Sequence, residues 1–378
     1  MSEKKVSVVI PMYNAKQYIF HCIEGLKKQT LQDLEIIVVD DCSTDGSYDL
    51  CAEKYAGDER VKILRQPQNG GPGAARNAGI QSATGEYITF VDCDDAVTTD
   101  AFSAMVRVAE EYDADVVHVG GALIPFAKEL PDDLLSLNAE QRIRFILDGE
   151  DLVDDASDGA EKVRVLSGDI CQRMDEWLRH FHHWNIWSKL YRREFLLEHR
   201  IGFVDLSLAE DQNFAFHCLL HAKNYVKMPG FFYLYRIAAE SLSRGKKNTN
   251  FMAKLLRTAF DLSACMDKTM DTHSFFSDNS DYRERVKAFC LMFLENGYIR
   301  DCYQTVGRSA LETDETIQGI FREHFGSNAG YIAKQFYDAH DAMPLPEGQA
   351  PDMNSYEFWE KMVERFGAGQ VIRLGRQS

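Results

Sequence analysis

Three carboxylates stand together directly after a short apolar run. Asp92, Asp94 and Asp95 follow residues 87–91, which read Tyr-Ile-Thr-Phe-Val. Like charges this close repel one another, so the cluster is costly unless a cation lies among them. Mg²⁺ and Mn²⁺ prefer hard oxygen ligands and commonly complete their coordination with substrate phosphate oxygens. The pattern predicts a Mg²⁺ or Mn²⁺ site at Asp94 and Asp92, with a turn or a helix cap as the simpler alternative.

A second pair of carboxylates, Asp40 and Asp41, follows the apolar run 34–39. A carboxylate in this position can accept hydrogen bonds from a base edge or from ribose hydroxyls. The alternative is that the pair caps a helix that begins after Ser43.

A third run, Val6 to Ile10, is followed by Pro11, Tyr13 and Asn14. The ring of Tyr13 is suited to stacking on a nucleotide base, and Pro11 and Asn14 would shape the loop around it. Proline lacks a donor for a strand ladder, so the strand is expected to end at Pro11.

A glycine-rich stretch at residues 69–77 contains Pro72 and Arg76. Exposed backbone N–H groups at such a helix start suit an anion, and the Arg76 fork suits phosphate or carboxylate. The stretch matches neither the P-loop nor the dinucleotide-binding pattern. Two interpretations stay open: phosphate binding, or close packing of the helix on a sheet with Arg76 paired to a strand-end Asp.

Strands and helices alternate over the first 120 residues. Strands are predicted at residues 6–10, 34–39, 61–64, 87–91 and 115–119. Helices are predicted at residues 18–28, from 43–45 to 55, 72–82 and 101–112. This alternation indicates an α/β fold with a mostly parallel, doubly wound sheet. Ligands of such sheets bind beyond the carboxyl ends of the strands, where all of these candidate residues stand.

Four segments together resemble the family-two glycosyltransferases of GT-A fold: VSVVIPMYN, VVDDCSTDGS, GPGAARNAG and GEYITFVDCDD. Their order and spacing agree throughout residues 6–95. The resemblance implies that Tyr13 and Asp41 contact the base, usually uracil. It also implies that Asp94, the second Asp of an Asp-x-Asp motif, binds the metal. Asp40 would lie near the nucleotide or serve the helix cap.

The resemblance continues towards bacterial members that build capsule, exopolysaccharide or lipopolysaccharide. It includes Trp187 to Arg193, residues 201–203, Leu208 to Phe214 and Tyr233 to Arg236. In this family the Glu-Asp pair supplies the catalytic base, so Asp211 is the first candidate and Glu210 the second. Trp187, Lys189 and Arg236 are expected to bind substrate. Ser188 stands where the family usually has Asn.

These residues predict an inverting glycosyltransferase, in which an Asp base activates the acceptor hydroxyl and a divalent cation assists the direct displacement. The donor would be a nucleotide-diphosphate sugar. Uridine diphosphate is favoured because it is the usual nucleotide in the family that the chain resembles. The acceptor would be a saccharide or a lipid-linked saccharide. A sugar-1-phosphate nucleotidyltransferase is a weaker alternative, since the basic Gly-rich loop after the first strand is missing. A non-catalytic relative is another, although both carboxylate sets are retained.

Composition and net charge limit the binding partners and the cellular location that we expect. The net charge of −17 disfavours binding to nucleic acids and anionic lipids. The nine cysteines are scattered without a C-x-x-C pair, which favours a reducing compartment. No apolar run is long enough to span a membrane, so we expect a cytoplasmic protein that at most contacts a membrane surface.

The chain is expected to divide into three parts. Residues 1–120 would bind the nucleotide sugar, and residues 121–248 would bind the acceptor and include a variable insertion. Residues 249–378 would form a helical C-terminal region. Apolar spacing near 3.6 predicts helices at residues 139–147, 170–181, 251–266, 282–303, 312–325 and 356–366, with a proline-containing linker at 341–351.

Overall fold

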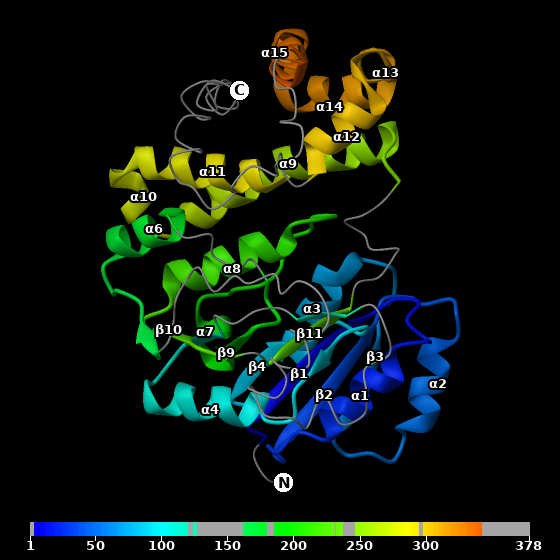
Figure 1. Ribbon diagram of the computed structural model, residues 1–378, viewed down its shortest axis with the longest axis vertical. Coiled ribbons are helices and arrows are strands. Elements are labelled where there is room, and N and C mark those ends of the chain that lie inside the picture. The colour runs from blue at the N-terminus through cyan, green and yellow to red at the C-terminus, as the bar shows by residue number, and fades with distance from the viewer. Residues whose placement is uncertain are drawn as a thin grey trace. The chain divides into compact units, whose positions relative to one another are not determined.

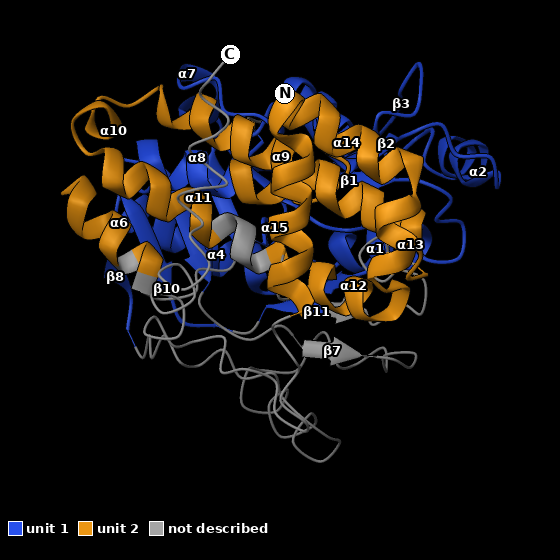
Figure 2. Ribbon diagram, turned by 90° about the horizontal axis from the view of Figure 1, so that it is seen from above, with its two compact units in different colours: residues 1–168, 184–205, 214–238 blue, residues 169–183, 206–213, 239–378 orange. Residues whose placement is uncertain are grey.

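The computed structural model describes residues 4–119, 124–126, 162–179, 185–230, 232–236, 246–294 and 298–341. The predicted helices at 139–147 and 356–366, and the linker beyond its first residue, lie outside these ranges. The chain divides into two compact units, coloured separately in Figure 2. Unit 1 comprises Met1–Gly168, Trp184–Asp205 and Phe214–Ala238. Unit 2 comprises Asp169–His183, Leu206–Asn213 and Ala239–Ser378.

Unit 1 is built on an eight-stranded sheet with the order β3-β2-β1-β4-β9-β6-β10-β8. Its strands are β1 (Val6–Met12), β2 (Leu34–Asp40), β3 (Val61–Arg65), β4 (Tyr87–Phe90), β6 (Val116–Val119), β8 (Arg164–Val165), β9 (Lys189–Arg192) and β10 (Tyr225–Met228). Strands β1 to β4 are parallel, β9 is antiparallel to β4 and β6, and β8 is antiparallel to β10. A second sheet joins β5 (Ala96–Val97), β11 (Tyr233–Arg236) and β7 (Ile124–Phe126).

The helices of the first 120 residues are α1 (Ile19–Lys27), α2 (Ser47–Lys54), α3 (Gly71–Ser82) and α4 (Ala101–Glu111). They alternate with the strands as predicted, and the mostly parallel α/β fold is confirmed (Figure 1). Helices α7 (Arg193–Glu198) and α8 (Glu210–His221) follow. Within the described ranges, no helix combines the length and the apolar character that crossing a membrane requires.

The expectation that the first strand ends at Pro11 is wrong, since β1 continues to Met12. The Val9 carbonyl accepts from the Val91 N–H, so Val9 and every second residue after it direct their polar backbone groups toward β4. The β1–β4 pairing ends at Val9 and Phe90. A donor at Pro11 is therefore not needed, and the strand remains paired with β2 through Met12 and Asp40.

Helix α3 lies against β1 at Gly79. A Cβ atom on Gly79 would stand 2.2 Å from Cγ1 of Val9, a buried residue of the sheet. We expect Gly79→Ala to lower the free energy of unfolding by about 1–3 kcal/mol, because the helix must move away from the strand. Urea denaturation measures this, with Gly57→Ala as the control, since a Cβ there meets no atom within 4 Å. Equal loss in both variants would contradict this explanation.

A buried carboxylate links three segments at the start of the sheet. Oε1 of Glu35 accepts hydrogen bonds from the Ser7 hydroxyl at 2.6 Å and from the Thr84 N–H at 2.6 Å. The Thr84 hydroxyl and the Gly85 N–H also donate to it. Burial by itself would raise the pKa of Glu35, but these donors outweigh it and the pKa is lowered.

This lowered pKa predicts how stability depends on pH. A carboxylate whose pKa is lower in the folded chain stabilises the fold above its unfolded pKa, about 4.3, and loses that contribution as the pH falls through its folded pKa. Glu35→Gln should therefore lower stability at pH 7 and lose less than wild type on acidification. Denaturation midpoints from pH 7 to pH 3 measure this, with the exposed Glu53→Gln as control. Parallel acid curves for wild type and Glu35→Gln would contradict it.

The described part of unit 2 is helical. Its elements are α6 (Ile170–Arg179), α9 (Thr249–Met270), α10 (Phe275–Asp278), α11 (Ser280–Leu294), α12 (Arg300–Val306), α13 (Arg308–Thr313), α14 (Glu315–Phe325), the 3₁₀ turn η5 (Gly326–Asn328) and α15 (Ala329–Asp341). Most of helix α11 and the start of α12 lie within the helix predicted over 282–303, and residues 298–299, just before α12, are helical as well. Residues 295–297 lie outside the described ranges, so the continuity of this helix stays a prediction.

Helix α14 begins at Glu315, later than the start of the helix predicted at 312–325. The Asp314 carboxylate accepts from the N–H groups of Thr316 and Ile317, which caps α14 and sets its start at Glu315.

Candidate active site

The predicted nucleotide and metal residues of unit 1 lie at one edge of the large sheet. Parallel pairing aligns Met12 with Asp40, and the Asp41 N–H donates to the Met12 carbonyl at 2.8 Å. On the other side of β1, the Val91 N–H donates to the Val9 carbonyl. The segments that follow β1, β2 and β4 therefore emerge next to one another (Figure 1). This is the edge at which doubly wound sheets bind their ligands.

The carboxylate cluster after β4 is folded into a turn that Tyr233 holds. The Asp95 N–H donates to the Asp92 carbonyl at 3.1 Å. The Tyr233 hydroxyl accepts from the Asp92 N–H at 3.1 Å and donates to Oδ2 of Asp95 at 2.7 Å. Burial first, and then the charges of Asp95 and Asp92, raise the pKa of Tyr233, so the phenol stays a donor. One buried side chain thus fixes both ends of the turn.

Arg76 reaches this turn from α3. Its Nη2 donates to Oδ1 of Asp92 at 2.8 Å, and its guanidinium lies 5.4 Å from the ring centre of Phe203. Only 6% of Arg76 is exposed. Of the two interpretations left open for Arg76, the ion pair with a strand-end Asp is present in the structure. It offsets part of the repulsion among the carboxylates, and phosphate binding by Arg76 stays a prediction.

The turn offers hard oxygen donors for a divalent cation. Asp92 and Asp94 are partly exposed, whereas Asp95 is 2% exposed and accepts from Tyr233. Burial, with the charges of the three neighbouring carboxylates, raises the pKa of Cys93 and keeps this thiol protonated. In the described ranges, no three His, Cys, Asp or Glu side chains alone form a metal cage. Mg²⁺ and Mn²⁺ are commonly held by one or two carboxylates and completed by substrate phosphates, and binding of either ion at Asp94 and Asp92 stays a prediction.

The loops after β1 and β2 are tied together through Asn14. Its N–H donates to the Ser43 hydroxyl at 2.8 Å, and its side-chain oxygen accepts from the Thr44 N–H at 2.8 Å. Asn14 has φ +50°, a left-handed conformation that Asn tolerates. Next to it, Tyr13 is 53% exposed, whereas Pro11 is buried in β1. Asn14 thus shapes the loop, and the ring of Tyr13 is accessible for stacking on a base.

The two carboxylates after β2 have different environments. Asp40 is fully buried, accepts from the Ser43 N–H at 3.2 Å and forms an ion pair with Nε of Arg65 at 3.3 Å. The bond to Ser43 closes the turn before α2, whose N-cap is Gly46 and has no side-chain cap, so the alternative that the pair caps this helix is wrong. Contact of Asp40 with the nucleotide therefore stays a prediction that its burial does not favour.

Asp41 bridges β2 and the glycine-rich stretch. Its two oxygens accept from the N–H groups of Gly70 and Gly71, each at 2.8 Å, at the start of α3. The helix N-terminus that was expected to bind an anion thus already binds a carboxylate of the same chain. The same bonds fix the orientation of Asp41, which is 3% exposed, so its contact with a base stays a prediction.

The three residues predicted to bind substrate between residues 185 and 236 are Trp187, Lys189 and Arg236, and their surroundings differ. Trp187 stacks on Tyr233 with ring centres 4.2 Å apart. Lys189 is 1% exposed in β9, and its ammonium donates to the Asn185 carbonyl and, at 3.1 Å, to Oδ1 of Asn185. It therefore holds a loop, and substrate contact by Lys189 stays a prediction. The backbone of Arg236 ends β11, and its side chain lies outside the described residues.

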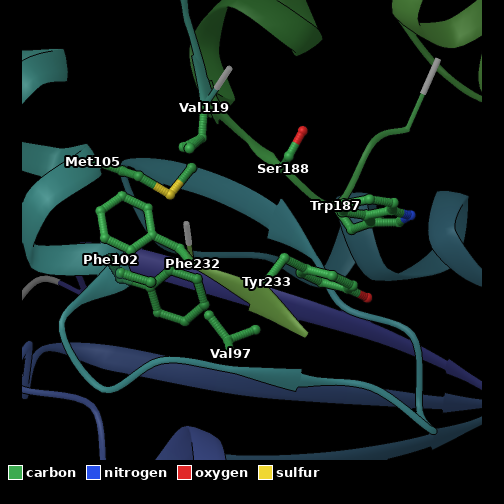
Figure 3. A pocket seen from close by; sticks show the side chains of 9 residues that line it. Val97, Phe102, Met105, Val119, Trp187, Ser188, Phe232 and Tyr233 are labelled. Atoms are coloured by element: carbon green, nitrogen blue, oxygen red, sulfur yellow. The ribbon is translucent and has the colours of Figure 1, made fainter. Parts of the chain in front are cut away.

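An apolar pocket shares Trp187 and Tyr233 with this site (Figure 3). Its other lining residues come from β5, α4, β6 and the segments next to β9 and β11: Val97, Ala101, Phe102, Met105, Val119, Ser188 and Phe232. Tyr233 thus has a polar end on the carboxylate turn and an apolar body in the pocket. Tyr233 therefore connects the carboxylate turn with the apolar side chains around the pocket.

The candidate base belongs to unit 2. Glu210 is 7% exposed and Asp211 is partly exposed, in the first turn of α8. Ala209, just before them, has φ +61°. The Ser207 hydroxyl is hydrogen-bonded to that of Thr258 on α9 at 3.1 Å. Burial lowers the pKa of Lys254, and the charge of Glu210 acts against this shift.

Two residues of the site were not among the predicted ones. Asp95 was grouped with its neighbours, but its role as the acceptor for Tyr233 has no local sequence signal. Tyr233 lies within the Tyr-Leu-Tyr-Arg segment, which was noted for Arg236 alone. An aromatic residue in a short strand usually indicates a core position, and only the fold shows that its hydroxyl reaches the turn.

Comparisons with known proteins bear on the family and the fold of the chain. The family model described as "Glycosyl transferase family 2" matches residues 7–131. The uncharacterized glycosyltransferase YibD of Escherichia coli (strain K12) is 32% identical over 265 residues, which cover 68% of this chain and 69% of YibD. The uncharacterized glycosyltransferase EpsJ of Bacillus subtilis (strain 168) is 32% identical over 243 residues. That alignment covers 63% of this chain and 62% of EpsJ, less than two thirds of its length.

Among solved structures, S. aureus TarS 1–349 in complex with UDP has the same GT-A fold. It superposes with a TM-score of 0.56 at 17% identity, covering 97% of this chain and 92% of TarS 1–349. The alignments and the fold agree with one another. The chain therefore belongs to glycosyl transferase family 2.

Proposed function

We propose that the protein is an inverting glycosyltransferase that moves a sugar from a nucleoside diphosphate donor to a saccharide or lipid-linked acceptor. The carboxylate turn at the end of β4 carries this proposal. Asp92 and Asp94 are held there by Tyr233 and Arg76, next to the loops that follow β1 and β2. The turn also lies within the residues that match the family model.

Uridine diphosphate is the proposed nucleotide. Tyr13 presents an accessible ring, and Asp41 is held in place by the glycine-rich stretch. An exposed aromatic ring suits stacking on a base, and a fixed carboxylate suits a hydrogen bond from the base edge. TarS, which shares the fold, has been crystallised with UDP.

Asp94 and Asp92 would hold Mg²⁺ or Mn²⁺ together with the donor diphosphate. The cation supplies charge neutralisation for the departing diphosphate. The chain itself keeps both carboxylates in position: Arg76 bonds one oxygen of Asp92, and Tyr233 fixes the turn on either side of Asp94. Rigid placement matters because misoriented groups lose most of their effect.

Asp211 is the proposed base, with Glu210 as the second candidate. The base accepts the proton of the acceptor hydroxyl as that oxygen attacks the anomeric carbon. The bond from the anomeric carbon to the diphosphate oxygen breaks as the new glycosidic bond forms, so the anomeric configuration inverts. Asp211 is partly exposed, as a base that meets an incoming hydroxyl must be.

The acceptor is proposed to be a saccharide or a lipid-linked saccharide. The net charge of −17 disfavours nucleic acids and would limit membrane contact to local patches.

The proposed function is tested by incubating the protein and Mn²⁺ with UDP-, GDP-, CDP- and TDP-sugars. Release of nucleoside diphosphate and transfer to p-nitrophenyl glycosides would be measured by chromatography. We expect turnover with UDP-sugars and a product of inverted anomeric configuration. Turnover with none of the donors would contradict a transferase and favour a binding role for the fold.

A further inference from the structure

The third carboxylate of the turn after β4, Asp95, differs from the other two in its surroundings. Asp95 is 2% exposed, whereas Asp92 and Asp94 are partly exposed. Its Oδ2 accepts from the Tyr233 hydroxyl at 2.7 Å. A cation that also binds a diphosphate needs ligand oxygens that face the incoming substrate. The burial of Asp95 and its bond to Tyr233 therefore point to a role beside the metal ligands.

Strand pairing brings Tyr233 to the turn. Strands β11 and β5 are antiparallel, with Tyr233 opposite Val97. The Thr98 N–H donates to the Phe232 carbonyl at 2.9 Å, just beyond this pair. The turn at residues 92–95 leads directly into β5. The register of the small sheet thus places the tyrosine opposite a residue that follows the turn by two positions.

Packing holds the ring of Tyr233 in place. The side chain is 4% exposed and stacks on Trp187 with ring centres 4.2 Å apart. Its hydroxyl points away from Phe102 and Met105, the apolar side of the pocket (Figure 3). Because the ring is fixed, the position of its oxygen is fixed as well. Tyr233→Phe therefore removes this oxygen and keeps the packing.

This one oxygen joins the two ends of the turn. It accepts from the Asp92 N–H at 3.1 Å and donates to the side chain of Asp95. The Asp92 carbonyl accepts from the Asp95 N–H at 3.1 Å, and the Cys22 thiol donates to it at 3.7 Å. Asp94 lies between these two ends in the sequence. Loss of the tyrosine oxygen would release the backbone before Asp94 and the side chain after it at once.

We propose that Tyr233 and Asp95 are positioning residues that hold the turn on both sides of Asp94 and so set its affinity for a divalent cation, which rests on the proposed function. Asp95 is not a ligand in this arrangement. A turn with fixed ends presents Asp92 and Asp94 to the cation without a further loss of conformational entropy. Removal of a group that orients metal ligands typically lowers metal affinity by roughly 10- to 100-fold.

The test is calorimetric titration of UDP into Tyr233→Phe over a series of Mn²⁺ concentrations. We expect the Mn²⁺ concentration that gives half of the gain in UDP affinity to rise by roughly 10- to 100-fold. UDP affinity without Mn²⁺ should stay at the wild-type value, and saturating Mn²⁺ should restore most of the gain. A wild-type dependence on Mn²⁺ in Tyr233→Phe would overturn the inference, whatever happens to the melting temperature.

Tyr55→Phe is the matched control. Tyr55 is also 4% exposed, and its hydroxyl donates to Oε1 of Glu24 at 2.9 Å. The variant loses the same kind of bond to a carboxylate without touching the turn. It should lower the melting temperature and leave the dependence on Mn²⁺ unchanged.

Asp95→Asn distinguishes a positioning residue from a ligand. Asn keeps an oxygen that accepts from the Tyr233 hydroxyl, so its loss of Mn²⁺ affinity should be smaller than that of Tyr233→Phe. The double variant should need no more Mn²⁺ than Tyr233→Phe alone, because both changes act through one bond. Losses that multiply would show that Asp95 contributes separately, as a metal ligand does, and would overturn the inference.

If Tyr233→Phe does not fold, Asp95→Asn decides alone. A partial loss of Mn²⁺ affinity supports the inference. Complete loss of the Mn²⁺ effect, the outcome expected of Asp94→Asn, would make Asp95 a ligand and overturn it.

The inference and the proposed function fail in different ways. Mn²⁺-dependent UDP binding in wild type with no change in Tyr233→Phe contradicts the inference alone. A wild-type protein that turns over no nucleotide sugar contradicts the proposed function. UDP binding that does not respond to Mn²⁺ in wild type contradicts the metal site and the inference together.

Discussion

Asp94→Asn is expected to lower kcat/KM for sugar transfer by about 10³-fold, because a cation contributes several kcal/mol of charge stabilisation and each 1.36 kcal/mol is a factor of ten. Asn keeps the size of the side chain but loses the charge. The turn should stay folded, since its bonds involve the Asp92 backbone, Asp95 and Tyr233. Initial rates over a range of Mn²⁺ concentrations would measure the loss.

The control is Asp49→Asn, an exposed carboxylate in the first turn of α2. It removes the same charge from unit 1 without touching the turn, and should change kcat/KM less than 2-fold, about 0.4 kcal/mol. An Asp94→Asn variant with wild-type rates and wild-type dependence on Mn²⁺ would refute the metal assignment.

The second large effect is expected at the base. Asp211→Asn should bind the donor nucleotide as wild type does and lower kcat for transfer by roughly 10²–10⁴-fold, the range for removal of a general base. Rapid-quench measurement of product together with calorimetric binding of UDP separates the two steps. The profile of kcat against pH should also lose its acidic limb, since that limb reports protonation of the base.

Glu210→Gln is the comparison, because the two carboxylates are adjacent but differ in exposure: Glu210 is 7% exposed and Asp211 is partly exposed. We expect the Glu210 variant to keep most of the activity. A larger loss of activity in Glu210→Gln than in Asp211→Asn would assign the role of base to Glu210. Wild-type kcat in both variants would show that neither carboxylate is the base.

The strand ends were predictable because they depend on simple rules. Short β-branched runs followed by Asp or Asn specify parallel strands and place their polar ends at one edge. The positions of β1, β2 and β4 follow from the sequence in this way. The later strands β9 and β10 were not predicted, because their antiparallel and parallel pairings with β6 depend on contacts far along the chain.

Individual roles at the edge were less predictable than its location. Asp40 and Asp41 are neighbours in sequence, yet Asp40 closes a buried turn and Asp41 binds the start of α3. Alternation of side chains along the strand separates them, and only the packed structure shows which groups each one meets. Arg76 had two physically reasonable partners; the position of α3 brings it to Asp92, and its binding of phosphate stays a prediction.

The central claim is tested most directly by calorimetric titration of UDP into the wild-type protein with and without Mn²⁺, repeated with Asp94→Asn. The proposed mechanism predicts binding that strengthens at least 10-fold with Mn²⁺ in wild type, about 1.4 kcal/mol, and no such gain in the variant. UDP binding of equal strength with and without Mn²⁺ in both proteins, or no nucleotide binding at all, would contradict it.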